Sequence, residues 1–154
     1  MTVAIGVTVT GWGRPGSPCE PDYIGKQSSD VCADSRGTVS LDNLTVSATP
    51  LASADDEAGG IALCSSVTLS NNTGEKQDYN AQDFTIQDPT GAAGSDDGSG
   101  APAIRGTLRS GALGPGGTKT GTICDHRPSR KGLYAVFYEP SLFGGQRGVW
   151  LSRH

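Results

Sequence analysis

The chain has 154 residues, of which 34% are hydrophobic and 18% charged, and its formal net charge at neutral pH is −4. This length is typical of one domain, and the composition is too apolar and too varied for a wholly disordered chain. The densest basic cluster is Arg127, Arg130 and Lys131, which argues against nucleic-acid binding because that needs a concentrated basic face.

The first element is Thr2 to Thr10, in which Val3, Ile5, Val7 and Val9 alternate with small and hydroxylated residues. A period of two predicts a half-buried strand. The competing interpretation is the stub of a cut signal or membrane anchor, although the apolar run is far shorter than the ~20 residues that cross a bilayer. A basic leader region and a cleavage site are both missing. We therefore expect an ectodomain whose export signal or anchor was left out of this sequence, or a virion protein, which needs no signal.

Residues 12–36 are rich in glycine, proline and serine and should form a loop that a disulfide between Cys19 and Cys32 holds together. Trp12 and Tyr23 within this extension have two open interpretations: exposed contacts for a partner, or packing beside the disulfide. We divide the chain into an N-terminal extension, residues 1–37, and a β-sandwich, residues 38–154, packed as one domain.

Short apolar runs separated by turn residues fill the rest of the chain, and none has the spacing of a helix. The acidic segment Ser53 to Gly60 should be a connector, and the low-complexity segment Ala92 to Ala101 a mobile loop. Seven to nine short strands predict an all-β, immunoglobulin-like sandwich. The expected strands are Thr38–Pro50 with a bulge or tight bend at Asp42–Asn43, Ile61–Ser70, Tyr79–Asp88, a weaker Ile104–Leu113, Thr118–Asp125, Leu133–Tyr138 and Val149–Leu151.

The four cysteines, Cys19, Cys32, Cys64 and Cys124, form an even set without any CxxC pair. Close ligand pairs are typical of zinc sites, so we expect no metal. Three pairings are open, and we favour Cys19 with Cys32 and Cys64 with Cys124, because the first two share a loop and the last two lie in strands. Each bond would contribute ~3–4 kcal/mol, and both indicate an oxidising compartment.

The bond between Cys64 and Cys124 has a predictable position in the sandwich. Both cysteines fall in the opposite phase to Leu63, Val67 and Ile123. If these apolar residues face the core, the bond lies on the outer side and ties two neighbouring strands of one sheet. It would then differ from the bond between sheets in antibody domains.

The sequence shows no catalytic constellation and no cofactor motif. The only histidines, His126 and His154, lie at a strand end and at the C-terminus, and neither has the neighbours of a catalytic base. The paired carboxylates Asp55–Asp56–Glu57 and Asp96–Asp97 lie in loops, so a calcium site or rigid acid–base work is disfavoured. Asn71 begins a match to the glycosylation acceptor sequence, as does Asn43, and we regard both matches as accidental.

The order and spacing of several motifs carry a family resemblance. They are Tyr23–Lys26, Leu44–Val46, Val67–Thr73, Asp83–Ile86, Leu113–Gly116, Gly121–Cys124, Leu133, Val136, Tyr138–Pro140 and Trp150. From Asp22 to Leu151 the chain resembles the telokin-like, immunoglobulin-fold domain of unknown function found in secreted proteins and lipoproteins of actinobacteria and firmicutes. Asp125 departs from the pattern, which has a bulky apolar residue there. The resemblance implies a sandwich and an extracellular location, and it carries over no catalytic residue.

We therefore expect a non-enzymatic extracellular or cell-surface module that presents loops or a sheet edge to an unidentified protein partner. An alternative is a self-assembling surface, filament or virion subunit that uses residues 2–10 for strand addition, which would make the protein a homo-oligomer. A membrane anchor, if there is one, would lie outside this sequence, and nucleic acid is not an expected partner.

Overall fold

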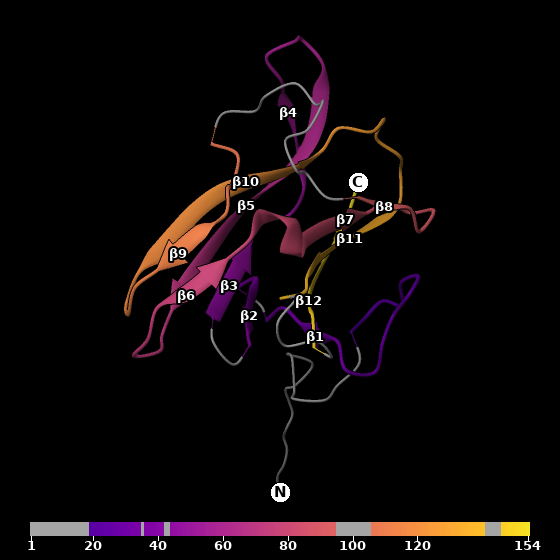
Figure 1. Ribbon diagram of the computed structural model, residues 1–154. Coiled ribbons are helices and arrows are strands. Elements are labelled where there is room, and N and C mark those ends of the chain that lie inside the picture. Colours follow the sequence, from indigo (N-terminus) through magenta and orange to yellow (C-terminus); the bar gives the residue numbers. More distant parts are fainter. Residues whose placement is uncertain (1–18, 35, 42–43, 95–105, 141–145) are drawn as a thin grey trace, which may run out of the picture.

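The computed structural model describes residues 19–34, 36–41, 44–94, 106–140 and 146–154. The described strands form two five-stranded sheets and one two-stranded sheet (Figure 1). The expected strand Thr2–Thr10 and Trp12 lie outside the described residues. Within these ranges, no helix has both the length and the apolar character needed to cross a bilayer.

The first sheet has the strand order β1-β12-β11-β7-β8. All neighbours in it are antiparallel except β1 and β12, which are parallel. Its strands are β1 (Val31–Cys32), β12 (Gly148–Arg153), β11 (Leu133–Tyr138), β7 (Phe84–Gln87) and β8 (Ala93–Gly94).

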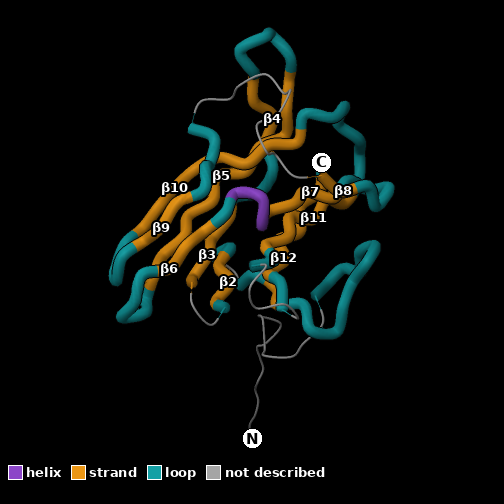
Figure 2. The backbone as a smooth tube through the Cα atoms, viewed as in Figure 1, coloured by secondary structure: helices purple, strands orange, loops and turns teal. Residues whose placement is uncertain are grey.

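The second sheet has the order β10-β5-β3-β2, and β4 pairs with the first residues of β5, ahead of those that pair with β3. Its antiparallel strands are β10 (Thr118–Asp125), β5 (Ile61–Asn71), β3 (Leu44–Ala48), β2 (Thr38–Ser40) and β4 (Ala52–Asp55). A third, small sheet pairs β6 (Gln77–Tyr79) with β9 (Gly111–Leu113). The single described helix, η2 (Ala81–Asp83), is a short 3-10 turn that leads into β7 (Figure 2).

The main core lies between the two large sheets and takes one phase of the longer strands. Its members include Val39, Val46, Leu63, Val67, Leu69, Phe84, Ile86, Ile123, Tyr134, Val136, Tyr138 and Trp150. β11 is buried on both faces, because Ala135 and Phe137 pack in a second cluster with Cys19 and Val149. This double burial explains why Leu133–Tyr138 is a continuous apolar run rather than an alternating one.

Cys64 and Cys124 lie directly opposite one another in the ladder between β5 and β10, with their Cα atoms 4.1 Å apart. Their neighbours Leu63 and Ile123 belong to the main core, whereas the two cysteines form a separate cluster with Ala62. The prediction of a tie between neighbouring strands of one sheet is therefore confirmed. Asp125 ends β10 opposite Leu63.

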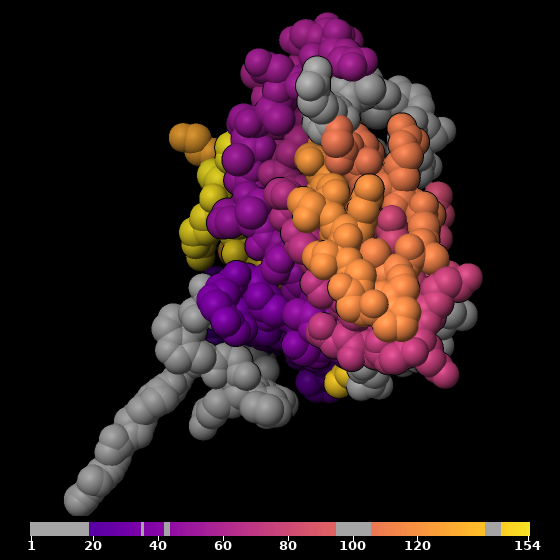
Figure 3. Space-filling model, turned by 90° about the vertical axis from the view of Figure 1, so that its left-hand side faces the viewer, coloured from indigo at the N-terminus to yellow at the C-terminus, as the bar shows by residue number. Residues whose placement is uncertain are grey.

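The solvent side of the second sheet is covered by hydroxyl groups, and Figure 3 views the molecule from the side where β10 reaches the surface. Thr68 and Thr120 are paired in the ladder, and their hydroxyl oxygens lie 3.0 Å apart. Other serines and threonines occupy the same phase of these strands, namely Thr38, Ser40, Thr45, Ser47, Ser66, Ser70, Thr118 and Thr122. This face has the alternation of a sheet with one side in water.

The described strands outnumber the seven to nine expected, because several are too short to show a pattern. β1 lies within the expected loop of residues 12–36, and β4 takes up part of the connector Ser53 to Gly60. The expected strand Thr38–Pro50 is two antiparallel strands, β2 and β3, and the bend expected at Asp42–Asn43 lies outside the described residues. Ile61 lies in the same phase of β5 as the buried Leu63, but it begins the strand and is 67% exposed.

Candidate functional site

The described chain begins at the edge of the first sheet, where it is fastened to β12. Cys19 is bonded to Cys32 at the end of β1. β1 continues the sheet, since the Val31 N–H donates to the Arg147 carbonyl (2.9 Å) and the Ala33 N–H to the Val149 carbonyl (3.0 Å). The cysteines pair in the way that the sequence favoured, and they hold the loop between them against the sheet.

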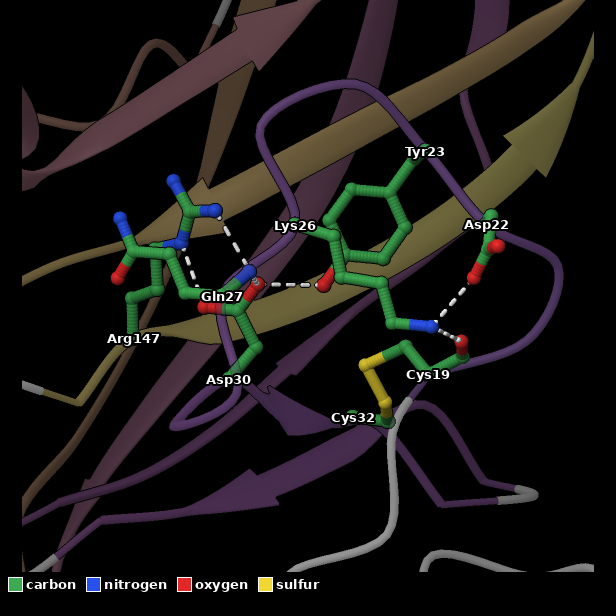
Figure 4. Close-up of a disulfide and its surroundings, with 8 residues drawn as sticks. All are labelled: Cys19, Asp22, Tyr23, Lys26, Gln27, Asp30, Cys32 and Arg147. Atoms are coloured by element: carbon green, nitrogen blue, oxygen red, sulfur yellow. Dashed lines mark hydrogen bonds and ion pairs between the residues drawn. A yellow bond between two sulfur atoms is a disulfide. The ribbon is translucent and has the colours of Figure 1, made fainter.

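A buried ion pair supports the same loop from the side of β12 (Figure 4). Arg147 donates to both carboxylate oxygens of Asp30, at 2.7 and 3.1 Å, and to the Gly25 carbonyl at 2.6 Å. Its guanidinium also lies 4.0 Å from the centre of the Phe137 ring. Only 12% of the Arg147 side chain and 2% of the Asp30 side chain is exposed, so this bidentate pair is shielded from water.

Tyr23 completes the network around Asp30. Its hydroxyl donates to an Asp30 carboxylate oxygen at 2.5 Å, and its ring centre lies 6.0 Å from that of Phe137. Burial raises the pKa of Tyr23, and the hydrogen bond to Asp30 raises it further. Burial alone would raise the pKa of Asp30, but hydrogen bonds from Arg147, Tyr23 and the Gln27 N–H together outweigh it and lower this pKa.

The edge of β12 is free beyond the point where β1 ends. Gly132 and His154 exchange both backbone hydrogen bonds across the ladder of β11 and β12. Such pairs alternate in an antiparallel ladder, so Trp150 and Ser152 also bond toward β11. The carbonyls of Arg147 and Val149 point the other way, toward β1. The backbone N–H and carbonyl of Leu151 also point away from β11, because Leu151 is two residues after Val149. Among the described residues, no strand pairs with Leu151 on that side.

A groove of about 510 Å³ runs along this free edge. Val149 and Trp150 point to opposite faces of the sheet, yet both line the groove. The groove therefore lies at the edge of the strand, where both faces can be reached. The Trp150 indole N–H donates to the Gly37 carbonyl at 2.6 Å and so fixes one wall. The remaining lining residues are Cys19, Glu20, Cys32, Ala33, Asp34, Arg36, Ala48, Thr49, Pro50, Val136, Leu151 and Ser152.

The residues singled out in the sequence divide between the groove and other places. Cys19 and Cys32 line the groove, whereas Cys64 and Cys124 lie in the second sheet. Tyr23 lines a smaller hollow of about 340 Å³ beside Ile24, which is 55% exposed. A partner contact through Tyr23 stays a prediction.

Two arginines of the basic cluster and the C-terminal histidine contact other residues of the fold. Arg127 donates to Asp125 (Nε to Oδ1, 2.9 Å) and to the Ile86 carbonyl at 3.0 Å, so it joins the ends of β10 and β7. The carboxylate of Asp88 lies 3.8 Å from both Arg127 and Arg130. The His154 ring meets the Tyr134 ring edge-on. The described part of the chain holds no group of three or more His, Cys, Asp or Glu residues that could bind a metal ion.

Sequence reasoning missed the groove, the Arg147–Asp30 pair and the free edge of β12. Arg147 follows a glycine-rich run that marks only a turn, and Asp30 lies 117 positions earlier in the chain. A single sequence holds no signal for that pairing. The edge of β12 is open because β1 is only two residues long. A strand of two residues is too short to show a sequence pattern.

No protein-family model and no curated protein matches the sequence. Among solved structures, the secreted protein MPT63 of Mycobacterium tuberculosis is similar with a TM-score of 0.59 and 14% sequence identity, over 80% of this chain and 98% of that one. The protein ycdA of Bacillus subtilis, described as a candidate lipoprotein, is similar with a TM-score of 0.57 and 13% identity, over 78% of this chain. The match spans only 39% of the ycdA chain. At these identities the similarity concerns the fold, and it assigns the chain an immunoglobulin-like β-sandwich.

Proposed function

We propose that the chain is a non-enzymatic extracellular module that binds an extended segment of a protein partner at the free edge of β12. The observation that carries this proposal is the groove of about 510 Å³ along that edge. An exposed strand edge offers main-chain donors and acceptors to an added strand, and pockets beside it receive alternate side chains. Leu151 supplies the main-chain groups, while Val136, Trp150 and Pro50 supply apolar walls.

Secretion or attachment at the cell surface is part of the proposal. The two disulfides fit an oxidising compartment. MPT63 is a secreted protein and ycdA a candidate lipoprotein, and both support an extracellular place for this chain. We further propose that the chain is a telokin-like domain of the kind found in actinobacterial secreted proteins, which its sequence resembles. An anchor outside this sequence would place the module at the membrane surface.

A photo-crosslinking amino acid at the groove tests the function. Arg36 is exposed and lines the groove, and Ala112, also exposed, lies in β9 outside it. With a crosslinker at position 36, the surface fraction of the producing cells should yield one crosslinked protein, and Pro50→Glu should abolish the product. The variant with the crosslinker at position 112 is the matched control. A product that is equal at both positions, insensitive to Pro50→Glu, or missing at position 36 contradicts the proposal.

Assembly is a second candidate, favoured by the same free edge, because strand addition between copies needs an unpaired strand. A neighbouring copy would supply residues 2–10. Light scattering on the full chain and on a chain lacking residues 2–10 decides between the two. Assembly predicts a mass that is a multiple of 15.8 kDa and falls to one copy after the deletion. A monomer in both samples rules it out.

A further inference from the structure

The inner part of the groove reaches between the two large sheets. Val136 lines it although that residue is only 2% exposed and belongs to β11, one strand further into the sheet than β12. Val136 and Trp150 are partners in the ladder, and both belong to the main core. On the opposite sheet the groove is lined by Ala48, the smallest of the core residues of β3, after Leu44 and Val46. An apolar side chain from outside therefore has a place between Ala48 and Val136.

The outer part of the groove has an acidic rim. Cys19 packs with Val149 on the other face of the first sheet, and Glu20 follows it at the rim, where it is exposed. The two other charged lining residues, Asp34 and Arg36, lie 3.7 Å apart and balance one another. Within the described ranges, no ion pair involves Glu20. Glu20 is therefore the charge that a partner meets at this rim.

A strand added to β12 would present successive side chains to these two environments, because side chains alternate between the faces of a sheet. The residue that points to the inner side meets Trp150, Val136 and Ala48. The residue next to it points to the side of Cys19 and Glu20. An apolar side chain suits the inner place because it leaves water there, and a basic side chain suits the rim because its charge is complementary to that of Glu20.

We propose that the groove selects extended segments in which an apolar residue is adjacent to a lysine or arginine. The inference rests on the proposed function in using the same groove, and it adds the chemistry of the partner. The apolar residue is the anchor and carries most of the affinity, since well-packed, desolvated contacts dominate binding. The basic residue lies at the exposed rim, so it contributes less and chiefly disfavours segments with an acidic residue there.

Titration with short synthetic peptides, followed by NMR on the full chain, tests the inference. The probe is Ser-Thr-Phe-Lys-Thr-Ser with both ends blocked, and the Trp150 indole N–H and the Leu151 amide report binding in the groove. Replacing the phenylalanine of the peptide with serine should weaken binding about tenfold or more. Replacing its lysine with glutamate should weaken binding about two- to fivefold, because the pair with Glu20 is exposed. Glu20→Lys should reverse the preference between the lysine and glutamate peptides.

Ala48→Leu fills the inner part of the groove from within the sandwich. This variant should lose the binding of the phenylalanine peptide, while amides of β5 report that the sandwich is folded. Ala112→Leu adds the same side chain at an exposed position of β9 outside the groove, and it is the matched control that should bind the peptide unchanged. The Glu20→Lys test does not depend on repacking the core, since Glu20 is exposed.

Three results would overturn the inference. Unchanged signals of Trp150 and Leu151 at saturating peptide show that the segment does not enter the groove. Equal affinity for the phenylalanine and serine peptides, or full binding to folded Ala48→Leu, shows that no anchor is inserted. A preference for lysine that persists in Glu20→Lys shows that Glu20 does not select the basic residue. None of these results removes the crosslink expected at position 36, so the inference and the proposed function can fail separately.

Discussion

Arg147 and Asp30 form a bidentate ion pair that joins the start of β12 to the loop between Cys19 and Cys32. The pair lies outside the groove, since neither residue is among its lining residues. Its role is to hold the loop, and with it the short strand β1, in the position that leaves the rest of the β12 edge open.

Removing the guanidinium should destabilise the protein strongly. Arg147→Ala leaves the Asp30 carboxylate buried without its partner, which typically costs about 3–5 kcal/mol. Arg147→Lys keeps a positive charge but loses the fork geometry and the contact with Phe137, so its loss should be intermediate. Chemical denaturation measures both. Arg36→Ala is the control, since 83% of that side chain is exposed, and it should change the unfolding free energy by less than about 0.5 kcal/mol.

The same pair makes stability depend on pH in the acid range. The pKa of Asp30 is lowered in the folded protein, so the unfolded chain binds more protons between the two pKa values and stability rises with pH there. This stabilisation is complete above the unfolded pKa of about 3.9 and is lost as the pH falls through the lower folded value. Asp30→Asn should give a shallower dependence of the unfolding free energy on pH below about 4. An unchanged slope would show that Asp30 does not contribute.

The bond between Cys64 and Cys124 should contribute stability without defining the fold. The two residues are 60 positions apart, for which the chain-entropy model gives about 4 kcal/mol. Replacing both with alanine should lower the unfolding free energy by that amount. The strand register should persist, because Leu63, Val67 and Ile123 remain in the core. Backbone NMR contacts between β5 and β10 check the register, and a shifted register would contradict the account.

Asn71 should tolerate no charge. It is fully buried, and its side-chain amide donates to the carbonyls of Glu75 (2.7 Å), Leu113 (2.9 Å) and Gly114 (3.1 Å). Asn71→Asp turns this donor into an anion facing three acceptors, which should cost about 3 kcal/mol or more.

The neighbouring Asn72→Asp is the matched control for this prediction. Asn72 is exposed and its side-chain amide donates to the Thr45 hydroxyl, so the loss of stability in this variant should stay below about 1 kcal/mol. Thermal unfolding compares the two variants. Equal losses would show that the buried network around Asn71 is not the cause.

The sheet strands with a clear period of two or a continuous apolar run could be predicted from the sequence. β10 and β11 begin and end at the expected residues, because patterning fixes which face is buried. The position of the bond between Cys64 and Cys124 followed from the same phase argument. Strands β1, β4 and β8 could not be predicted, since two to four residues carry no readable period and form only because a neighbouring strand pairs with them.

The candidate site was less predictable than the fold. It arises where β1 stops and leaves Leu151 unpaired, and this depends on tertiary pairing rather than on composition. Tyr23 had two open interpretations, a partner contact or packing beside the disulfide. It packs against the cluster that holds Cys19, and its hydroxyl donates to Asp30, while the partner contact stays a prediction. The prediction that a sheet edge is presented to a partner stays a prediction, and the groove lies at such an edge.

β12 has a free edge beside the groove, and amide exchange along that strand tests this most directly. In a chain lacking residues 2–10, the amides of Trp150 and Ser152 should be protected because they bond toward β11. The Leu151 amide between them should exchange rapidly, because it points to the open edge. Protection of Leu151 equal to that of its two neighbours would contradict the account.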